Sequence, residues 1–151
     1  MLVIGIGNRL RSDDGLGPVV IERLANLGLS ADMLREMNGE GAELMEAWQG
    51  TDSVYVVDAV AADAHPGKVT RQDVAHTPLP TGFFHYSSHA FGLAEAVETA
   101  RALGTLPKHV VVYGIEGECF EIGEGLSPTV AEAAEEVARR IRVELEEWSG
   151  A

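Results

Sequence analysis

The chain has 151 residues, 46% of them hydrophobic, and this length and apolar content predict one compact domain over residues 1–151. Its 24 Asp and Glu against 11 Lys and Arg give a net charge of -13, which argues against nucleic acid or an anionic membrane as a partner. No apolar stretch approaches the roughly 20 residues that span a bilayer, and no basic leader precedes the first apolar run. We therefore expect a cytoplasmic protein.

The chain begins with an apolar run, residues 1–6, that is typical of a buried parallel strand. The glycine-rich stretch at residues 5–17 carries two carboxylates, Asp13 and Asp14, and leads into an amphipathic helix at residues 18–24. Ligands of open α/β sheets bind at the carboxyl ends of strands, so this loop is a candidate binding site. Its negative charge favours a cation.

A phosphate-binding loop is the alternative interpretation of the same stretch, because Gly5 and Gly7 follow a first strand. The dinucleotide fingerprint needs a third glycine where this chain has Leu10, and Asp13 and Asp14 would repel a pyrophosphate. Nucleotide binding is therefore the less favoured alternative.

The next elements alternate between strand and helix. Residues 31–37 predict a short strand of mixed polarity at the edge of the sheet, and residues 42–48 predict a short helix after a glycine-rich turn. Residues 54–57 are apolar throughout, as a central parallel strand should be, and we expect this strand to end on Asp58.

Residues 63–80 are rich in turn-forming residues, with a short strand predicted at residues 68–72. The aromatic run at residues 83–86 is a candidate rim of a groove for a large protein partner, although packing of these rings into the core is the favoured interpretation.

The carboxyl-terminal half continues the alternation. Two serines precede a helix predicted over residues 89–103, so His89 is expected in its first turn. Residues 110–115 predict another buried strand, and Ser127 followed by Pro128 predicts the start of a last helix. The apolar stripe of that helix consists of Val130, Val137, Ile141, Leu145 and Trp148.

Strands alternating with helices predict an α/β fold, because right-handed crossovers place helices on both faces of a parallel sheet. We expect a three-layer sandwich with a mostly parallel, twisted sheet of about five strands and helices on both faces.

Three polar residues are expected where strand ends meet the open edge of this sheet: Asp14, Asp58 and His89. Two carboxylates and one imidazole form a three-ligand set that leaves positions open for substrate or water, and they suit nickel, zinc, manganese or iron equally. The residues alone leave structural alternatives open: Asp58 as a turn former, Asp14 as a helix cap beside a solvated Asp13, and His89 as a packed or capping histidine.

The other reactive side chains carry no signal of chemistry. Cys119 has no partner for an internal disulfide, and we interpret it as a packing residue rather than a nucleophile. Ser87 and Ser88 lack the Gly-x-Ser-x-Gly context of a nucleophilic serine and are interpreted as caps. The remaining histidines are interpreted as structural or exposed: His65, His76, His85 and His109.

Three segments in this order resemble the hydrogenase maturation endopeptidases: GIGNRLRSDDGLG at residues 5–17, VVDAV at residues 56–60 and SSHAFGLAEA at residues 87–96. The resemblance spans most of the chain and extends to residues 38–44, to the strand end at residues 112–116 and to the sequence LSP at residues 126–128.

The resemblance implies an α/β endopeptidase that removes the carboxyl-terminal extension of a nickel-iron hydrogenase large-subunit precursor after nickel has been inserted. Asp14, Asp58 and His89 fall on the family's three metal-binding positions; the first is Glu in some members and Asp here. It implies that the precursor supplies the nickel, that zinc or cadmium could replace it in crystals, and that hydrolysis uses no protein nucleophile. We expect a monomer acting on this precursor. A metal-binding accessory protein that docks on the precursor without cutting it remains the alternative function.

Overall fold

The computed structural model describes residues 1–60, 65–79 and 90–150. Strands and helices alternate along this part of the chain, with two short 3-10 helices, η1 and η2, beside the longer elements. The elements in order are β1 (Leu2–Ile6), η1 (Ser12–Gly15), α1 (Leu16–Asn26), η2 (Ala31–Met33), β2 (Leu34–Met37), α2 (Gly41–Trp48), β3 (Ser53–Val60), β4 (Val69–Asp73), α3 (Leu93–Leu103), β5 (His109–Glu116) and α4 (Pro128–Gly150).

The strands form one sheet in the order β2-β1-β3-β5-β4. Neighbours pair in parallel from β2 to β5, and only β4 runs antiparallel, on the edge beside β5. The pairing of Gly5 with Val57 brings the end of β1 beside the end of β3. The predicted α/β fold with a mostly parallel sheet is confirmed.

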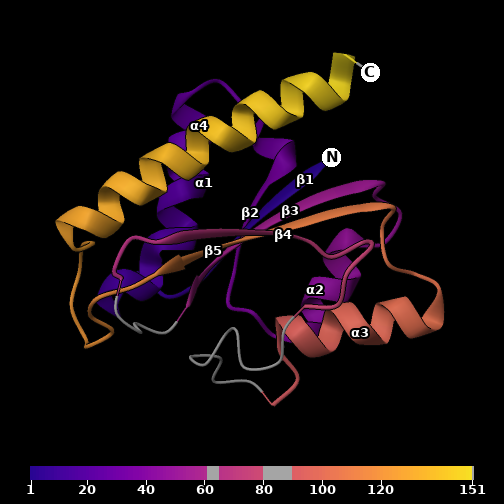
Figure 1. The fold of residues 1–151 in the computed structure, drawn as a ribbon, viewed down its shortest axis with the longest axis horizontal. Helices are drawn as coiled ribbons and strands as arrows, with labels where there is room; N and C mark the ends of the chain where they lie inside the picture. Colours follow the sequence, from indigo (N-terminus) through magenta and orange to yellow (C-terminus); the bar gives the residue numbers. More distant parts are fainter. Residues whose placement is uncertain (61–64, 80–89, 151) are drawn as a thin grey trace.

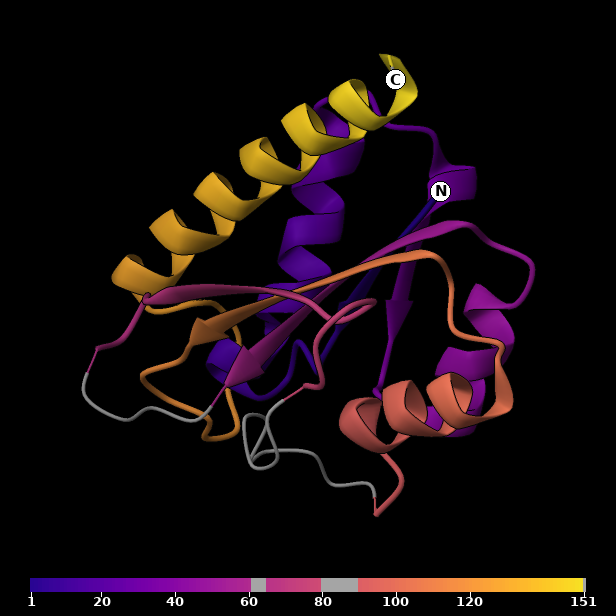
Figure 2. The ribbon, with the colours of Figure 1, turned by 45° about the vertical axis from the view of Figure 1, so that its right-hand side comes forward.

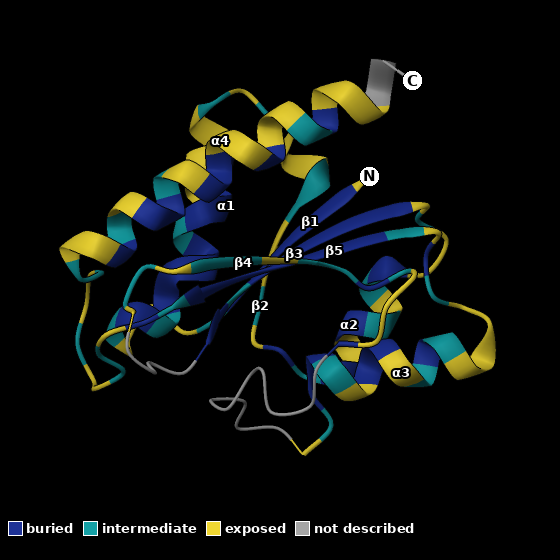
Figure 3. Ribbon diagram, in the orientation of Figure 1, coloured by how far each residue is buried: buried dark blue, intermediate teal, exposed yellow. Residues whose placement is uncertain are grey.

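Helices cover both faces of the sheet, which gives three layers. α1 and α4 lie on one face and α2 and α3 on the other (Figure 1), and the turned view shows the same separation (Figure 2). Alternate residues of each central strand enter one core or the other: Tyr55 packs with α1 and α4, whereas Val56 packs with α2 and α3. The central strands are buried along their length (Figure 3).

β1 and α1 approach each other so closely that both contact positions must be glycine. A Cβ at Gly5 would lie 2.3 Å from the carbonyl oxygen of Gly17, closer than any side-chain carbon can come. This contact fixes the start of α1 directly above the end of β1. The loop between them, residues 7–15, is closely packed at Asp13 and Gly15, whereas its residues 8–11 are exposed.

Two predicted boundaries and the burial of one side chain differ from the structure. β3 does not end on Asp58 but continues to Val60, because both following residues are apolar and buried. α3 begins at Leu93 with Gly92 as its N-cap, so the helix predicted from residue 89 is wrong for residues 90–92. Trp148 is 42% exposed rather than part of the buried stripe of α4. The aromatic run at residues 83–86 lies outside the described residues.

The remaining predicted elements are confirmed within a few residues, apart from the segment at residues 31–37, which divides into η2 and the short edge strand β2. No helix in the described part of the chain is both long and apolar enough to cross a membrane.

Candidate metal centre

Asp14 lies in the crowded loop between β1 and α1. Its carboxylate accepts a hydrogen bond from the backbone N–H of Asn8 at 3.0 Å, and its own N–H donates to the carbonyl of Arg11 at 3.1 Å. A Cβ at Gly7, where φ is 148°, would fall 1.8 Å from the carbonyl oxygen of Asp14, so the loop can close only over glycine. α1 has Gly15 as its N-cap and no side-chain cap, so the capping alternative for Asp14 is wrong.

Asp58 is the one carboxylate within β3, in a strand whose other residues are all buried. Its side chain points to the same face as Val54 and Val56, which pack beneath α2 and α3. Its Oδ1 accepts the N–H of Ala59 at 2.8 Å. The residue lies within the strand, so the alternative role of turn former is wrong.

Asp14 lies close enough to Asp58 for its charge to act on the Asp58 carboxyl. Burial raises the pKa of Asp58 well above its ordinary value, and the negative charge of Asp14 raises it further. Burial also raises the pKa of Asp14, although the hydrogen bond from Asn8 and the charge of Arg11 oppose that rise. A pair of carboxylates held together in this way binds protons more readily than isolated ones, and a divalent cation would relieve the same repulsion.

The two carboxylates therefore fit a cation, but the structure describes only two of the three predicted ligands. The structure brings Asp14 and Asp58 together at the carboxyl ends of neighbouring strands, whereas His89 lies outside the described residues. Among residues 1–60, 65–79 and 90–150, no three His, Cys, Asp or Glu side chains are grouped to hold a metal ion. The trio remains a prediction, with two members adjacent.

Asp13 is the residue that the sequence interpretation missed. The alternative that left it solvated is wrong, because it is completely buried. Its Oδ2 accepts the N–H groups of Glu118 and Cys119 at 2.8 and 2.9 Å, and Ser127 donates its N–H to Oδ1 at 2.7 Å and its hydroxyl to Oδ2 at 2.8 Å. Burial alone would raise the pKa of Asp13, but these hydrogen bonds outweigh it and hold the pKa below its ordinary value.

Backbone contacts join the same two segments, the Asp13 loop and the loop at residues 117–127. The N–H of Ser12 donates to the carbonyl of Gly123 at 2.8 Å, and its hydroxyl donates to the carbonyl of Glu121 at 2.8 Å. Ser12 has a φ of 52°, the only positive value at a non-glycine among the described residues, and these bonds hold it there. The hydrogen bonds of Ser12 and Asp13 thus anchor the loop that carries Asp14 to residues 117–127.

Arg9 ties the loop to the elements around it. Its guanidinium donates two hydrogen bonds to the carboxylate of Glu36, at 3.1 and 3.2 Å, and one at 3.2 Å to the carboxylate of Glu22. It also donates to the carbonyl of Pro18 at 3.2 Å. The Arg9 guanidinium therefore links the loop to both β2 and α1.

A polar hollow of about 450 Å³ opens beside this loop, where β2 leads into α2. Its lining residues are Gly7, Arg35, Glu36, Met37, Asn38 and Glu43. Gly7, which lines the hollow, packs against the backbone carbonyl of Asp14, so the hollow lies next to the loop that carries this residue.

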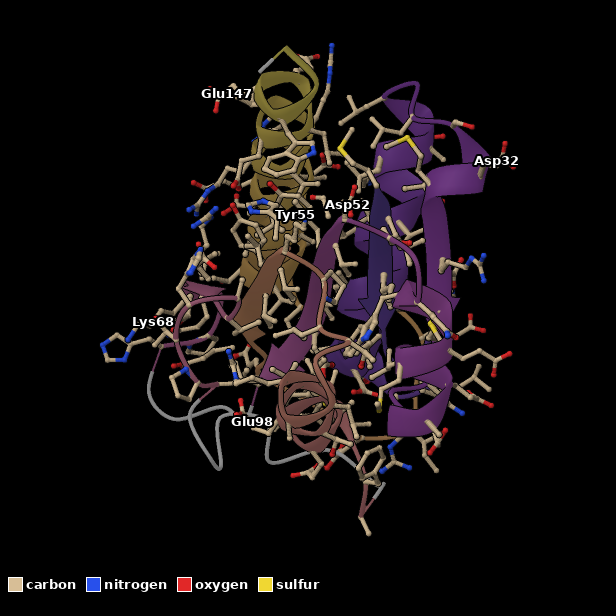
Figure 4. The ribbon with its side chains drawn as sticks, turned by 90° about the vertical axis from the view of Figure 1, so that its right-hand side faces the viewer. Asp32, Asp52, Tyr55, Lys68, Glu98 and Glu147 are labelled. Atoms are coloured by element: carbon tan, nitrogen blue, oxygen red, sulfur yellow. The ribbon has the colours of Figure 1, made fainter. Side chains whose placement is uncertain are left out.

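A second group of ionisable side chains lies between the sheet and α4. Glu144 accepts hydrogen bonds from the hydroxyls of Tyr55 and Tyr113 and from Arg71, whose Nη2 lies 2.5 Å away. Tyr55 points from β3 toward α4 (Figure 4) and also contacts the ring of His109 through a 3.1 Å bond. Burial and the hydrogen bond and charge of Glu144 raise the pKa of Tyr113 to about 12, so its hydroxyl keeps the proton that it donates to Glu144 and helps to hold α4 to the sheet.

The other histidines and the cysteine agree with their structural interpretation where they are described. His65 and His76 are exposed and His109 packs between Tyr55 and Trp148, whereas His85 lies outside the described residues. Cys119 is partly buried and contributes its backbone groups to Asp13.

The fold and the paired carboxylates define an open α/β protein with a candidate cation site at the carboxyl ends of its central strands. The model of the HycI family, described as hydrogenase maturation protease, matches residues 20–144. The chain belongs to this family of hydrogenase maturation proteases, which are peptidases. The matched range contains Asp58 and His89 and begins after Asp14.

Individual relatives agree with the family model. The chain is 28% identical to the hydrogenase 2 maturation protease of Escherichia coli over 97% of its own length and 91% of that protein. It is 30% identical to the hydrogenase expression/formation protein HupD of Thiocapsa roseopersicina over 87% of its length, but it spans only 61% of that relative. Its fold is similar to the hydrogenase maturating endopeptidase HybD from E. coli, with a TM-score of 0.78 and 27% identity over 97% of this chain and 91% of that one.

Proposed function

We propose that this protein is the endopeptidase that removes the carboxyl-terminal extension of a nickel-iron hydrogenase large-subunit precursor after nickel insertion. The observation that carries the proposal is the proximity of Asp14 and Asp58: the charge of Asp14 helps to raise the pKa of the buried Asp58 carboxyl in a member of this protease family. A cation that arrives with the substrate would relieve the repulsion between these two carboxylates.

In this proposal the nickel is part of the substrate, held by the precursor, and the protease recognises it with Asp14, Asp58 and His89. Asp14 in its loop and Asp58 in β3 would offer carboxylate oxygens to the same ion, and His89 would offer an imidazole nitrogen. A divalent cation at this position polarises a peptide carbonyl and makes bound water more acidic near neutral pH. Water then adds across the peptide bond, giving a new carboxylate and a new amine.

The chain's own residues supply position rather than a covalent nucleophile. Asp13 and Arg9 hold the loop that carries Asp14, and the strand β3 fixes the backbone of Asp58. The polar hollow beside Gly7 offers room for the chain on one side of the bond to be cut. Recognition through the metal would also explain why cleavage waits for nickel, because the carboxylate pair has little to bind in a precursor without it.

The test is to mix the protein with nickel-loaded and with nickel-free precursor and to follow the mass of the precursor. We expect a loss of mass corresponding to the carboxyl-terminal extension only with the nickel-loaded form. A stable complex without loss of mass would overturn the proposal and support a non-cleaving accessory protein instead. Cleavage that is equally fast without nickel would overturn recognition through the metal.

A further inference from the structure

Two large apolar side chains stand exposed on loops beside the carboxylate pair. Leu10 is 59% exposed and Ile122 is 83% exposed, the highest value among the large apolar side chains of the described residues. Single apolar residues on a surface are ordinary, but these two come from segments more than one hundred residues apart that are joined by backbone hydrogen bonds.

The pairing of the two loops brings them together. Arg11 forms an isolated parallel bridge with Gly123, in which the N–H of Gly123 donates to the carbonyl of Leu10 at 2.9 Å. Leu10 and Ile122 are the residues directly before the two members of this bridge, so the bridge brings together the loops that carry them. The apolar pair is thus produced by specific backbone hydrogen bonds between the loops.

The loops that carry the pair are held rigidly. The Asp13 carboxylate accepts four hydrogen bonds from residues 118–127. Ser12, the residue after the bridge, donates two more to the same segment. A patch that is already ordered loses little conformational entropy when a partner covers it. The exposure of Leu10 and Ile122 is therefore a fixed property of the surface.

The charges around the pair indicate the chemistry of a partner. Glu118, Glu121 and Glu124 are exposed on the loop that carries Ile122, and they form no ion pair with any described residue. On the other loop Arg11 is exposed and Asp14 adds a carboxylate, so the acidic groups outnumber this cation beside Leu10. A partner that fits this surface has an apolar centre bordered by Lys or Arg side chains.

We propose that Leu10 and Ile122 form the docking patch for the hydrogenase precursor and anchor the protein surface that surrounds its metal. This inference rests on the proposed function, because it names the same substrate. Leu10 and Asp14 lie four residues apart on one loop, so a partner whose metal reaches the carboxylates also covers the apolar pair. The patch accounts for affinity and the carboxylates for the reaction.

The test uses Leu10→Ser, Ile122→Ser and the double variant, with Leu103→Ser as the matched control. Leu103 is 66% exposed but ends α3, near the opposite ends of the strands. With nickel-loaded precursor we expect each single variant to raise KM about tenfold and the double variant more, with kcat unchanged. The control should keep the KM of the unaltered protein. An unchanged KM in the double variant would overturn the docking patch.

The acidic border is tested separately with Glu121→Gln combined with Glu124→Gln. Raising the salt concentration should increase KM for the unaltered protein, and this dependence should be weaker in the double Gln variant. Equal salt dependence in both proteins would contradict a basic border on the partner.

Failure of the docking patch can be separated from failure of the proposed function. Titration of the precursor into the protein, followed by calorimetry, measures binding whether or not cleavage follows. Cleavage with an unchanged KM in the serine variants would overturn only the patch. Binding that the serine variants weaken, without any cleavage, would overturn only the endopeptidase function.

Discussion

Asp13 and Ser127 are 114 residues apart in the sequence, yet two hydrogen bonds join them, from the N–H of Ser127 at 2.7 Å and from its hydroxyl at 2.8 Å. The bonds connect the loop before α1 to the first residue before α4. Since Asp14 is the next residue along that loop, the position of a predicted metal ligand depends on a buried carboxylate whose oxygens accept four hydrogen bonds from other parts of the chain.

We expect Asp13→Asn to lower the free energy of unfolding by about 2–4 kcal/mol, because an amide N–H would face backbone N–H donors and the charge would be lost. Denaturant unfolding measures the change. Asp32→Asn is the matched control, since Asp32 is exposed at η2 (Figure 4), and it should change stability by less than about 0.5 kcal/mol. Equal stability of the two variants would contradict the role of Asp13.

The stabilisation by Asp13 should depend on pH in a defined direction. The folded protein lowers the pKa of Asp13, so the unfolded chain takes up its proton at a higher pH than the folded one. The contribution is complete above the pKa of the unfolded chain, about 3.9, and is lost as the pH falls through the lowered value. The stability difference between the protein and Asp13→Asn should therefore shrink in acid. A difference that grows in acid would contradict this sign.

Asp58 should behave in the opposite way. Its pKa is raised in the folded protein, so the folded state holds this proton more tightly and stability falls as the pH rises through the raised value. We expect Asp58→Asn, freed of metal with a chelator, to melt at a higher temperature than the unaltered protein at about pH 8 and to lose this advantage near pH 4. A lower melting temperature at about pH 8 would contradict an unfavourable ionised carboxylate at this position.

Removal of any predicted ligand should abolish cleavage and weaken metal binding together. We expect Asp14→Asn, Asp58→Asn and His89→Ala each to lower the affinity for nickel by at least about 100-fold, measured by calorimetric titration. His76→Ala is the control, because His76 is exposed on the loop after β4. Full cleavage by any one of the three variants would remove that residue from the ligand set.

Cleavage should not need a protein nucleophile. We expect Cys119→Ala and Ser88→Ala to keep kcat within about a factor of three, because alanine at position 119 preserves the backbone bonds to Asp13 and a metal-directed reaction needs neither side chain. Steady-state cleavage of the precursor measures this. Loss of activity in a correctly folded variant would instead indicate a covalent intermediate.

The group around Glu144 should matter for stability and not for cleavage. We expect Glu144→Gln to lower the free energy of unfolding by about 1–3 kcal/mol, since it weakens bonds from Tyr55, Tyr113 and Arg71. Glu146→Gln is the control, because its ion pair with Arg142 is exposed and should contribute less than about 0.5 kcal/mol. A change in kcat for Glu144→Gln would show that this group reaches the active centre.

The sequence predicted the layers of the fold because the buried strands are continuous apolar runs, as at residues 54–57. It also placed Asp14 and Asp58 at neighbouring strand ends. Asp13 escaped detection because three of its four hydrogen bonds come from backbone N–H groups, which leave no trace in residue type. The start of α3 was misplaced because the two serines before His89 resemble a cap, whereas Gly92 takes that position. The role of His89 stays a prediction.

The hydrogen bonds to Asp13 constrain when its loop can fold while the chain is being synthesised on the ribosome. Every donor to its carboxylate belongs to residue 118 or later, whereas Asp14, Asp58 and His89 have all been synthesised by then. A growing chain therefore carries all its predicted ligands before it can set the first of them in place. The packing of the loop that carries Asp14 is complete only after residue 127 has been synthesised.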